Sequence, residues 1–374
     1  MKIIQIGPVT PEYGGSFFGG VATHLTQLVE TISKIGFETI VLSTTRKHII
    51  RQQVNVVGMA SLSTRFHFFI NKPLSSILSL VKGGKVGYIK ALYEYHIKSN
   101  YNPKETILHV HSLHCYFADN LLDDYNVIFT DHGFWQKKFN WGMLSERIKK
   151  SNRIISVSQY AKGRLTKTFP EAEEKTEVVY NPITPAENSH SNECERQYEK
   201  DVIFFNGYSE SLKRKGLDLL LSESVRKLKN EKFEVVVDNE GRDYIARQGK
   251  LENLVVNGKL PYEKIIGIYK KSKLMVLPSR SESFGIVYIE AASYGVPVIG
   301  FKPVIEEFNE FLGVDIGLSF DPTKETASEL LQKIEEAFST NWNYEEIKSA
   351  VERKFSWDYI SKDFVRIYKS SNLK

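Results

Sequence analysis

Cysteine is scarce in this sequence, which has only Cys115 and Cys194 among its 374 residues. Two cysteines so far apart supply neither a disulfide framework nor a Cys-x-x-Cys metal or redox pair. Long apolar runs are also missing: none reaches the roughly 18 residues of a membrane span, and the first apolar run is too short for a signal peptide. These absences predict a protein of the reducing cytoplasm without a membrane-spanning helix.

Several motifs of other enzyme classes are absent as well. The sequence has no Asp-x-Asp triplet, no His-Glu-x-x-His and no cysteine-rich ligand set, so the ligands of a metal-clamped group transfer are missing. It also lacks the G-x-x-x-x-G-K-[ST] loop and the G-x-G-x-x-G fingerprint. We therefore expect no metal site, and neither an NTPase nor a nicotinamide enzyme.

The composition indicates a folded protein. Hydrophobic residues make up 41% of the chain and charged residues 25%, as in ordinary globular proteins. Because a domain has roughly 100–200 residues, a chain of this length favours two domains.

Short apolar segments alternate with helical patterns along the chain, which is typical of parallel α/β folds. We expect strands at KIIQIG, ETIVLST, ILHVHS, NVIFTDH and RIISVS, and in the second half at DVIFFNG, FEVVVDN, LVVNG, KLMVLPS and PVIGF. Two such series predict an α/β protein with two Rossmann-like domains facing each other across a cleft.

A change of pattern marks the boundary between these domains. After a further expected strand around TEVVY and an Asn-Pro turn, the chain becomes polar and loses its periodicity, as interdomain linkers do. The expected segments are a first domain at 1–184, a linker at 185–200 and a second domain at 201–355. The remaining residues, 356–374, have apolar side chains at helical spacing and predict a terminal helix that packs back toward the first domain.

The net charge of +5 is unevenly distributed. Residues 46–102 contain nine cations and one carboxylate, Glu94, a balance of +8, interleaved with aromatic residues such as Phe66 and Phe68. This mixture suits an anionic membrane surface, and it equally suits a solvated helical face with ordinary core residues. We expect no nucleic-acid partner.

The segment SRSESFGIVYIEAASYGVPVIGF, residues 279–301, places two carboxylates in apolar surroundings. It follows a predicted strand, so a helix should begin near Phe284, with its first amides at the carboxyl end of the sheet, where ligands bind. Gly295 and Pro297 should end this helix. Glu282 then lies in the preceding loop and Glu290 about two turns along. Each carboxylate accepts from ligand hydroxyls, or else Glu282 caps the helix and Glu290 is an exposed charge.

This segment resembles the E-x7-E signature of the retaining family 4 glycosyltransferases, which have the GT-B fold. The resemblance extends, in the same order, over FFGGVATHLTQLVETISKIGFETIVLST, VIFTDHG, IISVSQYAKGRL, VVYNPI and FSWDYI. It is weakest between residues 45 and 105.

The resemblance implies roles for individual residues. Glu282, Phe284 and Gly285 would meet the sugar and phosphates of a nucleotide sugar donor, Glu290 its ribose, and His132 the donor sugar near the reacting carbon. Lys215, with Glu282 and His132, is a candidate catalytic residue. The remaining donor-binding candidates are Gly19, Gly20, Gly207, Lys213, Arg214, Ser283 and Ile286. Outside the resemblance, we interpret His132 as a satisfied structural histidine, like His109 and His111, and the two glycines as a turn before a helix.

One position departs from the family pattern. In FFNGYSESLKRKGLDLLL, Lys215 matches the family's lysine, but Tyr208 stands where an arginine is expected. Lys213 or Arg214 supplies the second cation, or activity is lower than typical, or the segment is a solvated charged loop.

The function implied is a metal-independent, retaining transfer of a sugar from a nucleotide diphosphate sugar to a hydroxyl of a glycan or lipid-linked glycan, as in cell-envelope polysaccharide biosynthesis. UDP- or GDP-linked donors are expected before ADP-linked ones, with no further cofactor. The enzyme would work in the cytoplasm, at the inner face of the plasma membrane. The alternatives are a nucleotide-sugar epimerase on the same fold and a catalytically silent binding subunit.

Overall fold

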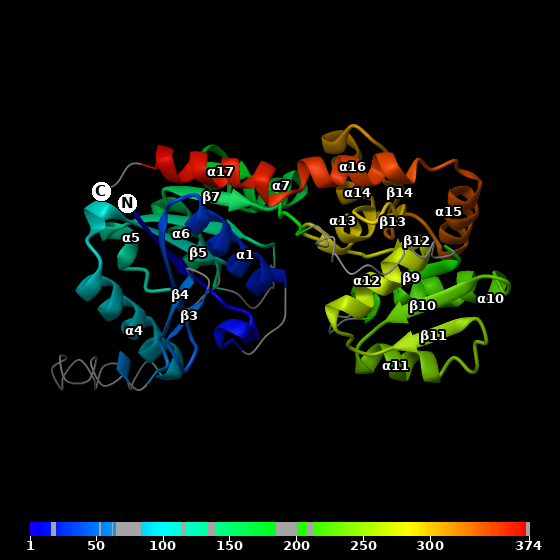
Figure 1. The fold of residues 1–374 in the computed structure, drawn as a ribbon, viewed down its shortest axis with the longest axis horizontal. Helices are drawn as coiled ribbons and strands as arrows, with labels where there is room; N and C mark the ends of the chain where they lie inside the picture. The colour runs from blue at the N-terminus through cyan, green and yellow to red at the C-terminus, as the bar shows by residue number, and fades with distance from the viewer. Residues whose placement is uncertain are drawn as a thin grey trace, which may run out of the picture. The chain divides into compact units, whose positions relative to one another are not determined.

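The computed structural model describes residues 1–15, 20–51, 54–61, 63–64, 84–113, 117–133, 140–184, 200–207 and 212–371. They form two compact units (Figure 1). The first contains Met1–Asn181 together with Ile360–Lys374, and the second contains Pro182–Tyr359. Of the linker expected at 185–200, only Lys200 is among the described residues.

The first unit is built on an eight-stranded sheet of order β3-β4-β2-β1-β5-β6-β7-β8. All neighbouring strands are parallel except β3 and β4. The strands are β1 (Lys2–Ile6), β2 (Glu38–Ser43), β3 (Ile49–Arg51), β4 (Val54–Gly58), β5 (Thr106–His111), β6 (Asn126–Asp131), β7 (Arg153–Ser156) and β8 (Thr176–Val178).

Helices cover both faces of this sheet, which explains why β5 and β6 are buried along their whole length. They are α1 (Gly20–Lys34), α4 (Gly84–Asn100), α5 (Leu121–Asp124), α6 (Trp141–Lys150), α7 (Gln159–Thr168) and α17 (Trp357–Ser370), with 3-10 turns at Pro11–Tyr13, Pro103–Glu105 and Pro170–Lys175. One core cluster joins α4, α6 and α7 to the central strands, and a second joins α1 to β2 and β4.

The second unit has a six-stranded, wholly parallel sheet of order β11-β10-β9-β12-β13-β14. Its strands are β9 (Val202–Asn206), β10 (Lys232–Val236), β11 (Leu254–Asn257), β12 (Ser272–Leu277), β13 (Val298–Phe301) and β14 (Gly317–Phe320). In chain order this is the 3-2-1-4-5-6 arrangement of a Rossmann fold, in which the direction of winding reverses between β9 and β12.

The helices of the second unit connect these strands. They are α8 (Leu212–Lys215), α9 (Leu217–Leu219), α10 (Val225–Lys227), α11 (Asn239–Ala246), α12 (Tyr262–Lys271), α13 (Ile286–Ala292), α14 (Lys302–Leu312), α15 (Ala327–Ser339) and α16 (Tyr344–Lys354), with a π-helical segment at Leu220–Ser224.

The expected α/β fold with two Rossmann-like domains is thereby confirmed. Each predicted strand is present, whereas β3, β4 and β14 were not expected; β3 and β4 fall where the resemblance is weakest. Gly295 ends the helical segment as expected, with a φ of 71° that a side chain would disfavour. None of the described helices combines the length and the apolar composition of a membrane span.

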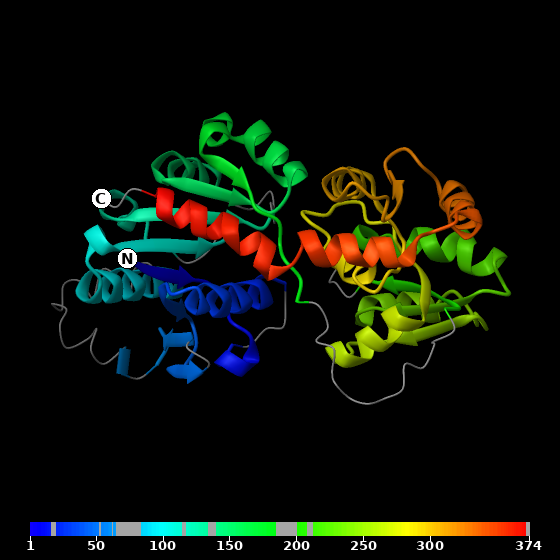
Figure 2. The same ribbon diagram turned by 45° about the horizontal axis from the view of Figure 1, so that its top comes forward.

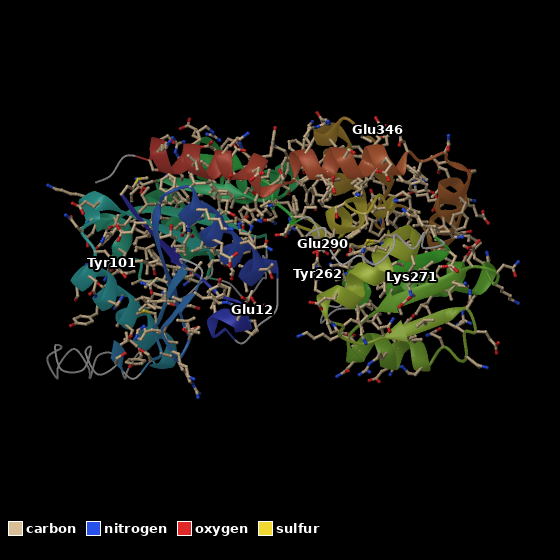
Figure 3. All side chains as sticks on the ribbon, in the orientation of Figure 1. Glu12, Tyr101, Tyr262, Lys271, Glu290 and Glu346 are labelled. Atoms are coloured by element: carbon tan, nitrogen blue, oxygen red, sulfur yellow. The ribbon has the colours of Figure 1, made fainter. Side chains whose placement is uncertain are left out.

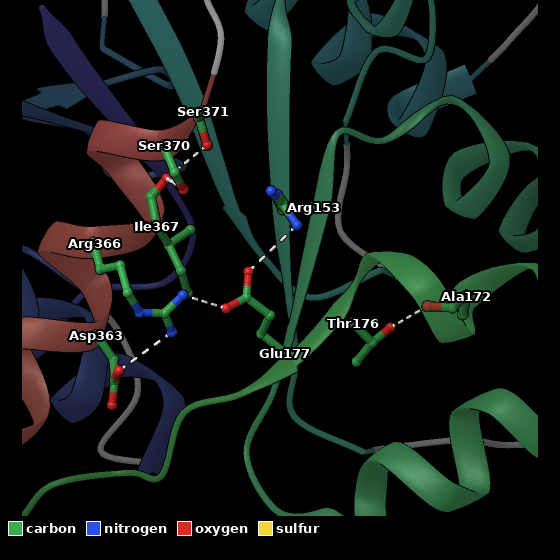
Figure 4. A network of polar contacts seen from close by, with 9 residues as sticks. All are labelled: Arg153, Ala172, Thr176, Glu177, Asp363, Arg366, Ile367, Ser370 and Ser371. Carbon is green, nitrogen blue, oxygen red and sulfur yellow. Dashed lines mark hydrogen bonds and ion pairs between the residues drawn. The ribbon is translucent and has the colours of Figure 1, made fainter.

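The last helix, α17, is amphipathic, as predicted. Figure 2 shows it lying across the strands of the first sheet beside α1. Its buried side chains include Ile360, Phe364, Ile367 and Tyr368. An outer ion-pair network holds the same helix to β8, because the Arg366 guanidinium lies 2.5 Å from a carboxylate oxygen of Glu177 (Figure 4).

Beneath α17 a directed chain of hydrogen bonds runs through the sheet. The Gln5 amide donates to the Tyr368 hydroxyl (3.1 Å), so Tyr368 donates its own proton to Nδ1 of His109 (2.7 Å). Nε2 of His109 must then carry hydrogen, which it donates to Thr130 (2.7 Å). Nε2 of His111 likewise donates to the Gln5 carbonyl oxygen (2.7 Å). Because Nδ1 of His109 accepts a hydrogen bond, this imidazole must be neutral, and burial lowers the pKa of His109 to about 3.

We expect Tyr368→Phe to destabilise the protein by about 1–3 kcal/mol, because it strips a hydrogen-bond partner from two fully buried groups, on Gln5 and His109. Urea denaturation followed by circular dichroism measures the loss. Tyr344→Phe is the control, since Tyr344 is 39% exposed. Equal midpoints for the two variants would show that the hydroxyl of Tyr368 contributes nothing specific.

Candidate functional site

The reversal of strand order in the second sheet locates a site. Where winding reverses, the loops after two neighbouring strands separate and leave room for a ligand at their carboxyl ends. The loop after β9 begins at Gly207, and the loop after β12 runs from Pro278 to Gly285. Most of the predicted donor-binding residues lie on these two loops or on the helices that they lead into.

A buried ion pair joins the two loops. Nζ of Lys215, at the end of α8, lies 2.6 Å from Oε1 of Glu282, and the Ser279 hydroxyl donates to the same oxygen (2.7 Å). The two charged side chains are only 13% and 8% exposed. Glu282 therefore finds its donors within the protein, and it is not the helix cap of the alternative interpretation, because Gly285 occupies that position.

Lys215 keeps further hydrogen-bonding capacity. An ammonium group has three N–H donors, and the hydrogen bond to Glu282 uses one of them. Gly207 lies close by, since a Cβ added there would come within 3.3 Å of Cβ of Lys215 and closer still to the Phe205 ring. The site thus holds an anchored, partly exposed cation of the kind that suits a phosphate.

The other two cations of α8 differ from Lys215. Lys213 is exposed, whereas Arg214 is partly buried and donates from Nη1 to the Ser281 carbonyl (3.4 Å). Both belong to the segment in which we predicted the second cation, and Arg214 contacts the loop after β12. Tyr208, the departure from the family pattern, lies outside the described residues.

The loop after β12 leads directly into α13. Gly285 has a φ of 74°, and a Cβ there would lie 2.5 Å from the Tyr288 ring, so glycine is required by both backbone and packing. Phe284 is buried against Phe308, with ring centroids 5.0 Å apart. Ser283 and Ile286 flank this turn and are partly buried.

Glu290 lies on α13 in different surroundings from Glu282. It is partly buried and accepts from the Tyr269 hydroxyl (3.1 Å), which in turn accepts from the Asn206 amide (3.3 Å). Burial raises the pKa of Glu290 to about 7, against which the Tyr269 hydrogen bond acts in the opposite direction. The alternative interpretation of Glu290 as an exposed charge is therefore wrong.

Tyrosine side chains surround Glu290. The rings of Tyr269 and Tyr294 stack 5.7 Å apart. Burial, to which the charge of Glu290 adds, raises the pKa of Tyr262 and that of Tyr294, the latter to about 12. Figure 3 shows Tyr262 and Glu290 side by side in the second unit. The Tyr294 hydroxyl is buried and has no hydrogen-bond partner among the described residues.

His132 follows β6 in the first unit and belongs to a group of buried histidines. Its ring stacks with that of His111 at 5.9 Å and meets that of His24 edge-on at 5.6 Å. Burial lowers the pKa of His132 to about 4, so the imidazole is neutral near pH 7. Nε2 of His132 and Nδ1 of His111 have no partner among the described residues, so the interpretation as satisfied histidines holds fully only for His109.

The remaining predictions for the first unit are only partly described. Gly20 begins α1, and a Cβ there would meet no described atom within 4 Å, whereas Gly19 lies outside the described residues. In the +8 segment, Lys90 pairs with Asp119 (3.1 Å), and Lys98 pairs with Asp124 (2.9 Å). Phe66 and Phe68 lie outside the described residues, so the membrane surface stays a prediction.

Several residues of the site could not be identified from the sequence pattern. Ser279 and Arg280 lie in the quoted segment and Asp218 three residues after Lys215, so their position near the motif was the available signal. Tyr269 and Asn206 gave no such signal, because only the packing of α12 against β9 brings them to Glu290. Among the described residues, no three His, Cys, Asp or Glu side chains are grouped to hold a metal ion.

The fold defines a two-domain α/β protein whose candidate ligand site lies at the switch point of its second sheet. Two family models match it: Glycosyltransferase Family 4 at residues 18–187, and Glycosyl transferases group 1 at residues 192–353. Together they account for most of the chain, which belongs to the family 4 glycosyltransferases of GT-B type.

Curated relatives are similar over part of the chain. It is 28% identical to an uncharacterized 41.2 kDa protein in the cps region of Klebsiella pneumoniae, over 58% of this chain and 66% of that protein. It is 26% identical to the uncharacterized glycosyltransferase MJ1607 of Methanocaldococcus jannaschii, over 59% and 60%. The O-antigen chain mannosyltransferase RfbU of Salmonella typhimurium is 22% identical over 59% and 62%. The chain thus spans less than two thirds of the length of these relatives.

Solved structures match over nearly the full chain and support the fold. The sucrose-phosphate synthase of Thermosynechococcus elongatus has a TM-score of 0.72 at 15% identity, covering 98% of both chains. The lipopolysaccharide outer core galactosyltransferase WaaB has a TM-score of 0.67 at 16% identity, covering 99% of both. Anabaena HepE, solved with UDP and glucose, has a TM-score of 0.65 at 15% identity, covering 99% of this chain and 100% of that one.

The raised pKa of Glu290 predicts a specific pH dependence of stability. The folded protein holds this proton more tightly than the unfolded chain does. The stabilising contribution is therefore fully present below the ordinary pKa of 4.5 and is lost as the pH rises through about 7. We expect Glu290→Gln to gain stability relative to the wild type between pH 5 and pH 8, measured by urea denaturation without ligand. The control is Glu306→Gln, whose carboxylate is 55% exposed. Parallel curves for wild type and Glu290→Gln would contradict the raised pKa.

Proposed function

We propose that this glycosyltransferase transfers a sugar from a nucleotide diphosphate sugar to a hydroxyl of a glycan or lipid-linked glycan, with retention at the anomeric carbon and without a metal ion. The observation that carries the proposal is the pair of glutamates at the switch point of the second sheet. One is ion-paired to a lysine with spare donors, and the other accepts from a neutral hydroxyl at 3.1 Å.

This arrangement suits the two ends of a nucleotide diphosphate sugar. Lys215 would donate to the diphosphate and neutralise the charge that develops as it leaves. Glu282, held by Lys215 and Ser279, would accept from a sugar hydroxyl, and Glu290 from the ribose hydroxyls. The neutral imidazole of His132 would donate or accept a hydrogen bond at the donor sugar. No general base is assigned, since the leaving phosphate can take the proton of the acceptor hydroxyl.

The acceptor class rests on the relatives. The Klebsiella protein belongs to a cps region, the Salmonella protein is named for the O-antigen chain, and WaaB for the lipopolysaccharide outer core. We therefore propose a cell-envelope polysaccharide as the product, made in the cytoplasm at an anionic membrane surface contacted by residues 46–102. A UDP- or GDP-linked donor is proposed before an ADP-linked one.

Donor binding tests this function directly. A thermal-shift panel of UDP-, GDP- and ADP-sugars in EDTA should show stabilisation by one class, since a ligand bound to the folded state raises stability by mass action. If Glu290 accepts from ribose, the corresponding nucleoside diphosphate should bind more tightly than its 2′,3′-dideoxy form, by about 1–3 kcal/mol.

In Glu290→Gln that preference for the ribonucleotide should shrink, whereas Glu306→Gln should keep it. If Glu290→Gln still preferred the ribonucleotide over the dideoxy form to the same extent, Glu290 would not be a ribose-binding residue. No stabilisation by any nucleotide sugar would overturn the proposed function.

Turnover tests the role of Lys215. We expect Lys215→Gln to lower kcat about a hundredfold or more while donor KM changes little, because charge on the leaving phosphate grows toward the transition state. Release of nucleoside diphosphate in the presence of an acceptor glycan measures both constants. Equal effects on kcat and KM would indicate uniform binding instead.

The variant Lys215→Gln also leaves Glu282 buried without its cation. The double variant Lys215→Gln with Glu282→Gln removes both charges and is the control for misfolding, since breaking one side of a buried ion pair is more destabilising than removing both.

A further inference from the structure

A second set of contacts, made by Arg280 and Asp218, holds the segment that carries Lys215. Lys215 ends α8, a helix of one turn that follows residues 208–211, and a short helix has little stability of its own. Its position must therefore come from tertiary contacts. The contacts found in the structure run from α8 and the residues after it to the loop that follows β12.

Arg280 makes most of these contacts. Its guanidinium binds Asp218 in a two-point fork, with Nη1–Oδ1 at 2.8 Å and Nη2–Oδ2 at 2.9 Å, and Nη1 also donates to the Lys213 carbonyl (2.5 Å). The backbone N–H of Arg280 donates to the Arg214 carbonyl (2.8 Å). One residue thus bonds to both residues before Lys215 and to the third residue after it.

Close packing completes the connection. Gly216 follows Lys215 with a φ of 77°, and a Cβ there would lie 2.2 Å from the Pro278 carbonyl oxygen. The backbone of the two segments is therefore in contact next to Lys215, and only glycine fits. Arg280 and Asp218 are partly buried, at 34% and 23% exposed, so their fork is partly shielded from water.

We propose that Arg280 and Asp218 are positioning residues that hold the Lys215–Glu282 pair in the geometry that binds the diphosphate of the donor. This inference rests on the proposed function. Asp218 acts through Arg280. Arg280 acts through its hydrogen bonds to the carbonyl groups of Lys213 and Arg214. Neither side chain is required to touch the ligand.

The sign of the Asp218 effect separates positioning from plain electrostatics. Asp218→Asn removes a negative charge near the site, which by Coulomb attraction alone would tighten the binding of an anion. Loss of the fork instead frees Arg280 and α8, which weakens diphosphate binding despite the more positive charge. If Arg280 instead contacted the phosphate directly, the affinity of Asp218→Asn for the diphosphate would likewise be unchanged or higher.

The experiment measures, by displacement calorimetry at fixed salt, the affinity of the full chain for UDP, GDP or ADP, whichever binds, and for the matching nucleoside. The ratio of the two affinities measures how much the diphosphate group contributes to binding. In Asp218→Asn we expect that ratio to fall about tenfold, which corresponds to roughly 1.4 kcal/mol, while nucleoside affinity stays the same. Glu223→Gln is the matched control: it removes a carboxylate from the following helical segment, where Glu223 pairs with Lys227 at 2.6 Å, and should leave the ratio unchanged.

Arg280→Lys provides a second test if Asp218→Asn does not fold. Lysine keeps the charge but lacks the planar fork, so the ratio should fall as it does in Asp218→Asn. An unchanged or higher ratio in Asp218→Asn, or a ratio fully retained in Arg280→Lys, would overturn the positioning role while leaving the proposed function intact. If the wild-type protein binds none of the three diphosphates, the proposed function itself fails, and this inference fails with it.

Discussion

The buried ion pair between Lys215 and Glu282 is the interaction on which the second unit's site depends. Each partner alone would be costly to bury, and at 2.6 Å each makes the other acceptable. The pair joins the segment after β9 to the segment after β12. These are the two strands at which the sheet reverses its winding. The topology of the sheet therefore brings the two charged side chains together at the carboxyl ends of neighbouring strands.

Much of this could be predicted from sequence, because the informative features are local. Apolar segments bounded by glycine and proline predicted the strands, and the eight-residue spacing of Glu282 and Glu290 predicted one carboxylate in the loop and one on the helix. Both glutamates lie where they were expected. Gly285 and Gly295 were informative for the same reason, since their positive φ values are properties of single residues.

The parts that could not be predicted depend on contacts between distant residues. The hydrogen bond from Tyr368 to His109 joins residues 259 positions apart, and no pattern in either segment predicts it. The fork between Arg280 and Asp218 requires the alignment of two loops, and the contact of Tyr269 with Glu290 requires the rotation of α12. The strands β3 and β14 were missed for a different reason: they are short, and their residues do not form a continuous apolar run.

The two glutamates of the motif have opposite environments, and this difference has a consequence for the proposed donor. Glu282 has the Lys215 ammonium beside it at 2.6 Å, so the protein itself supplies a cation to this carboxylate. Among the described residues, Glu290 has the Tyr269 hydroxyl as its hydrogen-bond donor, and burial raises the pKa of Glu290 to about 7. Ribose hydroxyls that donate to Glu290 would favour the carboxylate, so binding of the nucleoside end would release protons. Binding of the nucleoside end would then depend on pH near neutrality, because the ligand would supply hydrogen-bond donors to a carboxylate that burial disfavours.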